Sequence, residues 1–72
     1  MRYRVNWQKD GKAHDLLTGE TTPGGAIKSA YALLIEARPS DIWIETENGR
    51  RVASYADIVE DGSALASMPQ AD

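Results

Sequence analysis

The sequence contains no cysteine, and this absence excludes disulfide bonds, zinc–thiolate sites, iron–sulfur clusters and thiol nucleophiles. It also removes the covalent cross-links that stabilise many small domains. A chain of 72 residues can form one domain and is too short for two. At this size a hydrophobic core alone supplies roughly 3–5 kcal/mol, so we expect the domain to gain stability by self-association.

Long apolar segments are also missing. The longest apolar run, Ala30 to Ile35, has only six residues, and a polar, strand-like segment begins soon after Met1. A membrane span needs about 20 apolar residues, and a signal peptide needs an apolar core of its own near the N-terminus. We therefore expect neither segment and no membrane partner. The simplest expectation is a cytoplasmic protein of a bacterium or phage.

A concentrated positive charge is absent as well. Eight Lys and Arg residues are scattered along the chain against eleven acidic residues, which gives a net charge of −3. Because nucleic acids are bound largely through their phosphates, this balance disfavours nucleic-acid binding. Hydrophobic residues make up 42% and charged residues 26% of the chain, which is typical of a folded globular domain.

Motifs for catalysis and metal binding are not present either. His14 is the only histidine, and we expect it to be partly buried and hydrogen-bonded rather than a base or a metal ligand. Segment 23–29 has two glycines followed by Lys28 and Ser29, but two residues separate the glycines from the lysine, which a phosphate loop does not allow. We expect a helix start whose glycines approach the sheet, and a protein with no cofactor, no metal and no enzymatic activity.

What the sequence does contain is the pattern of strands joined by tight turns. Apolar and polar residues alternate over residues 2–8 and 41–47, which predicts two half-buried strands. Asp10-Gly11 and Asn48-Gly49 are strong signals for hairpin turns. Each turn should be followed by a partner strand, the first of them over residues 12–18.

Two further signals predict helices. Thr22-Pro23 suits a helix start, and the helix should end near Ala37 because Pro39 follows. Ser54 and Asp57 have the spacing of a capping box, which predicts a short helix over residues 55–60, with a longer fourth strand as the alternative. Residues 1–61 should form one compact domain and residues 62–72 a flexible C-terminal tail.

The resulting fold class is α+β, with the order ββαββ. A right-handed crossover through the long helix gives the sheet order 2-1-3-4, with antiparallel neighbours and the helix on one face. A two-residue turn at Asn48-Gly49 would place Glu47 opposite Arg50 and Glu45 opposite Val52.

The uncovered sheet face is the candidate interaction surface. Its predicted members are Arg2, Arg4, Leu17, Trp43, Glu45 and Val52. If Trp43 lies beside Leu17 and Val52, these side chains form an apolar patch rimmed by charge, which is typical of a contact surface. The alternative is that Trp43 lies flat beneath Arg4 in a cation–π contact and needs no partner.

These patterns favour a non-enzymatic interaction module. Its partner would be itself, as a homodimer, or another protein, bound through the open sheet face or a strand edge. The alternative is a nucleic-acid-binding accessory protein that uses four arginines, namely Arg2, Arg4, Arg50 and Arg51. An enzyme ranks last, because no set of acid, base and nucleophile is evident.

Overall fold

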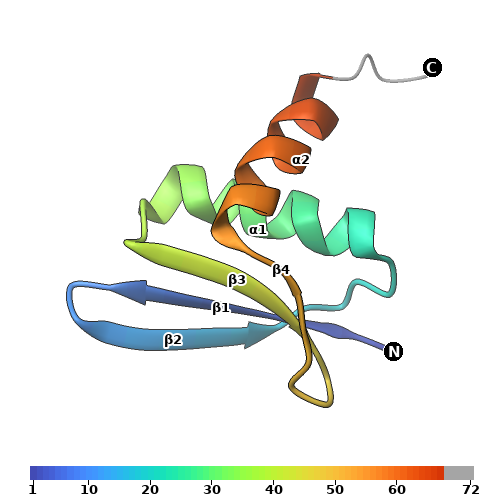
Figure 1. Cartoon of the computed structure of the whole chain (residues 1–72), viewed down its shortest axis with the longest axis horizontal. Coiled ribbons are helices and arrows are strands. Elements are labelled where there is room, and N and C mark those ends of the chain that lie inside the picture. The colour runs from blue at the N-terminus through green and yellow to red at the C-terminus, as the bar shows by residue number, and fades with distance from the viewer. Residues whose placement is uncertain (68–72) are drawn as a thin grey trace.

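The computed structural model describes residues 1–67, and its elements follow the predicted order with a second helix at the end (Figure 1). The strands are β1 (Tyr3–Lys9), β2 (Lys12–Leu17), β3 (Asp41–Thr46) and β4 (Arg51–Ala53), and the helices are α1 (Pro23–Ala37) and α2 (Tyr55–Ser67). The sheet order is β2-β1-β3-β4, and all neighbouring strands are antiparallel. The predicted α+β fold class and sheet order are therefore confirmed.

The first hairpin forms as its turn residues predict. Asp10 and Gly11 both have positive φ, 53° and 77°, as a type I′ turn requires. The turn pairs Lys9 with Lys12 and, further along, Trp7 with His14. This register fixes which side chains of β2 share a face with those of β1.

Helix α1 begins and ends where the capping signals predict. The Thr22 hydroxyl accepts a hydrogen bond from the Gly25 N–H at 3.1 Å, and Arg38 closes the helix in the left-handed region immediately before Pro39. The predicted role of the glycines is wrong. A Cβ at Gly24 would meet nothing within 4 Å, and one at Gly25 would collide with Glu20 and Thr22 in the preceding loop rather than with the sheet.

One small core joins the sheet to both helices. Val5, Ile42 and Ile44 contribute from the sheet, Ala30 from α1 and Ile58 from α2, and all five are at most 1% exposed. The small alanine side chain lets α1 lie close to the strands. The contribution of Ile58 shows that α2 is part of the core.

Helix α2 starts as predicted and ends later. Ser54 and Asp57 form the capping box: the Ser54 N–H and hydroxyl both donate to the Asp57 carboxylate at 3.0 Å, and the Asp57 N–H donates back to the Ser54 hydroxyl. The predicted end before Gly62 is wrong, because the helix continues to Ser67. Gly62 is buried, and a Cβ there would lie 2.5 Å from the Cβ of Tyr31 on α1.

Gly62 therefore permits a close helix crossing and does not terminate the helix. Residues 62–67 belong to α2, whereas the remainder of the predicted tail, residues 68–72, lies outside the described residues. The division into a compact domain over residues 1–61 and a tail stays a prediction.

The second hairpin has a different register from the predicted one. Asn48 does not adopt positive φ, whereas Gly49 does, at 85°. The loop consequently contains three residues. At its base the Thr46 N–H donates to the Arg50 carbonyl at 2.8 Å, and the Gly49 N–H donates to the Thr46 carbonyl at 2.9 Å. A bulge follows, so that Arg51 rather than Val52 lies opposite Glu45, and the predicted pair of Glu47 with Arg50 does not form.

Candidate interaction surfaces

The open face of the sheet brings together four of the six residues predicted for it. Arg4 lies opposite Leu17 on β2 and opposite Glu45 on β3, and Trp43 lies one pair further along β3, opposite Asn6. The other two predicted members lie elsewhere. Arg2 precedes β1, where its backbone N–H donates to the Glu47 carboxylate at 3.1 Å, and Val52 falls in the bulge of β4.

Polar side chains on this face satisfy one another. Arg4 forms an ion pair with Asp15 of β2 rather than with Glu45. Glu45 instead accepts a hydrogen bond from the Asn6 amide at 3.0 Å and one from the Trp43 indole N–H at 3.3 Å. Both carboxylate oxygens of Glu45 are therefore used within the chain.

Trp43 makes the predicted kind of contact with a different arginine. The guanidinium of Arg51 lies 4.7 Å from the centre of a Trp43 ring, within cation–π range. The shifted register of β4 explains why Arg51 reaches Trp43, because it places Arg51 opposite Glu45, two residues along β3 from Trp43. Leu17 lies on β2, with β1 between it and Trp43, so these two apolar side chains are not strand neighbours.

The outer edge of β2 presents free backbone groups. Thr18 donates its N–H to the Tyr3 carbonyl at 2.9 Å, which fixes the alternation of hydrogen-bonded pairs along the hairpin. Counting back from this pair, the N–H and C=O groups of Ala13, Asp15 and Leu17 point away from β1. All six residues of β2 are exposed, so these groups form an accessible strand edge.

Apolar side chains flank this edge on both faces. On the helix side, Leu16 is 55% exposed although it lies opposite the core residue Val5. On the open face, Leu17 is 37% exposed. Helix α1 therefore leaves β2 largely uncovered.

His14, on the helix side of β2, differs from the prediction. The side chain is exposed rather than partly buried, and its ring stacks on Trp7 with a centroid distance of 5.4 Å and an interplanar angle of 19°. Trp7 is half-buried at the margin of the core, as predicted.

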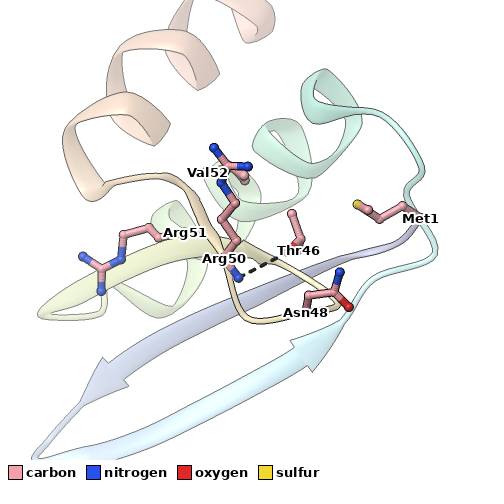
Figure 2. A pocket seen from close by; sticks show the side chains of 6 residues that line it. All are labelled: Met1, Thr46, Asn48, Arg50, Arg51 and Val52. Carbon is pink, nitrogen blue, oxygen red and sulfur yellow. Dashed lines mark hydrogen bonds between the residues drawn. The ribbon is translucent and has the colours of Figure 1, made fainter.

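A hollow of about 550 Å³ lies beside the second hairpin (Figure 2). Six residues from the chain start, the hairpin and β4 line it, namely Met1, Thr46, Asn48, Arg50, Arg51 and Val52. Figure 2 shows the Arg51 side chain extending away from the other five. The sequence alone does not predict this hollow, because the hollow depends on the three-residue loop and the bulge, which a two-residue turn would not produce.

The four arginines of the nucleic-acid alternative do not converge. Arg4 is held by Asp15 and Arg51 lies over Trp43 on the open face, whereas Arg50 lines the hollow. Arg2 is exposed before β1. Binding of nucleic acid stays a prediction, but two of the proposed contacts are already engaged within the chain.

Other kinds of site find no support within residues 1–67. No group of three potential ligand side chains is placed to hold a metal ion, and neither helix is long and apolar enough to cross a membrane. No family model matches the chain, and no curated protein or solved structure is significantly similar to it.

Proposed function

We propose that this protein is a cytoplasmic, non-enzymatic interaction module that pairs with a second copy of itself through the edge of β2. The observation that carries the proposal is the accessible strand edge, with outward backbone groups at Ala13, Asp15 and Leu17. Such an edge is a template for adding another strand, and main-chain hydrogen bonds supply the contact.

The open sheet face supports a contact less well than this edge. Its charged groups are already paired through Arg4 with Asp15 and through Glu45 with its two donors. Docking a partner there would require these groups to be desolvated without new hydrogen bonds, which costs free energy. Pairing at the edge leaves this network in place.

A second copy suits the edge because an antiparallel strand pair has two-fold symmetry. Outward residues must face outward residues, which allows only registers centred on a single residue of β2. Centring on Asp15 would place two carboxylates directly opposite each other. Centring on Leu16 places the two exposed leucines together and sets Asp15 opposite Leu17, so we propose this register.

Sedimentation equilibrium from low to high micromolar concentration tests the proposal. We expect a dimer for the parent, and a monomer for Leu16→Lys, because two ammonium groups would face each other in place of two leucines. Ile35→Lys is the matched control, since Ile35 on α1 is 56% exposed and Leu16 is 55% exposed. The control should dimerise as the parent does.

Two results would contradict the proposal. A parent that remains monomeric throughout the concentration range leaves no self-interface to explain. A Leu16→Lys variant that dimerises as strongly as the parent places the interface away from β2.

A further inference from the structure

The hollow beside the second hairpin combines the guanidinium of Arg50 with apolar walls. Met1 and Val52 are exposed apolar side chains, at 67% and 47%, and they share the hollow with Asn48 and Arg50. A volume of about 550 Å³ lies within the range of about 300–1,000 Å³ typical of small-molecule sites. The site is therefore large enough for a small organic ligand.

Arg50 is the charged group available to such a ligand. Its predicted partner, Glu47, instead accepts the backbone N–H of Arg2. Within residues 1–67, the only ion pair is that of Arg4 with Asp15. The guanidinium of Arg50 is thus free to receive an anion, whereas that of neighbouring Arg51 lies over Trp43.

We propose that this hollow binds a small carboxylate with a short apolar chain. The carboxylate would accept hydrogen bonds from the Arg50 guanidinium, whose planar fork matches two carboxylate oxygens, and from the Asn48 amide. The apolar chain would lie against Met1 and Val52. This site is separate from the β2 edge, since β4 forms the opposite edge of the sheet.

The lining residues argue against a nucleotide. No aromatic side chain lines the hollow, so a base would find no stacking surface. A polyphosphate would also need several converging cationic groups, whereas of the two lining arginines Arg51 is directed over Trp43, and the chain carries a net charge of −3.

The test is a titration of the ¹⁵N-labelled protein with hexanoate at pH 7, followed by amide chemical shifts. We expect amide shift changes at Arg2, which follows Met1, and over residues 46–52. The Kd should be on the order of 1 mM. Arg50→Gln should weaken binding about tenfold, because a charge-assisted hydrogen bond is lost. Arg38→Gln is the matched control and should bind as the parent does, because Arg38 is an exposed arginine at the end of α1 and does not line the hollow.

A titration with uncharged hexanol distinguishes a site that binds anions from a merely apolar surface. Hexanol should bind at least about tenfold more weakly than hexanoate, for the same reason as Arg50→Gln. Equal binding of the two compounds would overturn the assignment of a carboxylate. The absence of shifts over residues 46–52, or an equal loss of binding in Arg38→Gln and Arg50→Gln, would overturn the site itself.

Discussion

The two edges of the sheet are built in different ways (Figure 1). β4 has three residues and carries a bulge opposite β3, and the chain turns into α2 after Ser54. β2 has six residues, pairs regularly with β1 and is exposed throughout. One edge is therefore short and irregular, and the other is long and regular.

This difference bears on how the protein can associate. Exposed, regular edges invite strand addition, and proteins limit it by shortening or bulging an edge. A sheet with two open edges could extend into a ribbon of many copies. With one edge unsuitable for pairing, association through the other edge ends at a closed pair of two copies.

The largest effect on the difference between the two edges is expected from proline at neighbouring positions of β2. Leu16→Pro removes an N–H that faces β1, so we expect a loss of about 3 kcal/mol in the free energy of unfolding. Leu17→Pro removes an outward N–H and should change the stability of the monomer by less than about 1 kcal/mol. Urea denaturation measures both effects.

The same pair of variants tests the proposed contact between two β2 edges. Leu17→Pro should abolish dimerisation in sedimentation equilibrium although its monomer remains folded, because the lost N–H is one that the second copy would use. If both prolines destabilise the monomer equally, the assignment of outward groups along β2 is wrong.

A smaller effect is expected at the crossing of α2 over α1. Gly62→Ala should lower the free energy of unfolding by about 1–3 kcal/mol, because the new methyl group would overlap Tyr31. Helix propensity alone would favour alanine by about 1 kcal/mol, so the sign of the change tests the packing. The matched control is Gly24→Ala in α1, where a Cβ would meet nothing within 4 Å. A stabilised Gly62→Ala variant would contradict the close crossing.

The parts of the fold that local chemistry determines could be predicted from the sequence. Asp10-Gly11 fixed the first hairpin and its register, and Thr22 with Pro23 fixed the start of α1. Ser54 and Asp57 likewise marked the start of α2. Each of these signals acts within a few residues, so no knowledge of the tertiary structure is needed.

The features that sequence analysis missed depend on contacts between distant elements or on a choice between similar turns. Gly62 resembles a helix terminator until Tyr31 is placed beside it. Asn48-Gly49 suits a two-residue turn and also the three-residue loop that forms, and the difference of one residue exchanged Val52 for Arg51 on the open face. Arg4, Leu17, Trp43 and Glu45 therefore share the open face, whereas Arg2 and Val52 do not, and the role of this face as an interaction surface stays a prediction.

The smallest expected effect concerns the capping box of Ser54 and Asp57, which begins α2 directly after β4. Hydrogen bonds from the backbone N–H and the hydroxyl of Ser54 lower the pKa of the Asp57 carboxyl below its ordinary value of about 3.9. A carboxyl whose pKa is lowered by folding stabilises the folded state above the unfolded pKa, and this contribution is lost as the pH falls through the folded value. Asp57→Asn should therefore be less stable than the parent at pH 7, and the difference should shrink below about pH 4.

Thermal unfolding followed by circular dichroism between pH 3 and pH 7 measures this difference. Asp61→Asn removes one negative charge from the same helix outside the capping box, so it controls for net charge. If Asp57→Asn and the parent keep the same stability at pH 7, the capping box does not hold the start of α2. The bulge would then limit β4, and the packing of Gly62 against Tyr31 would hold α2 in place. The capping box would contribute nothing to the difference between the two edges.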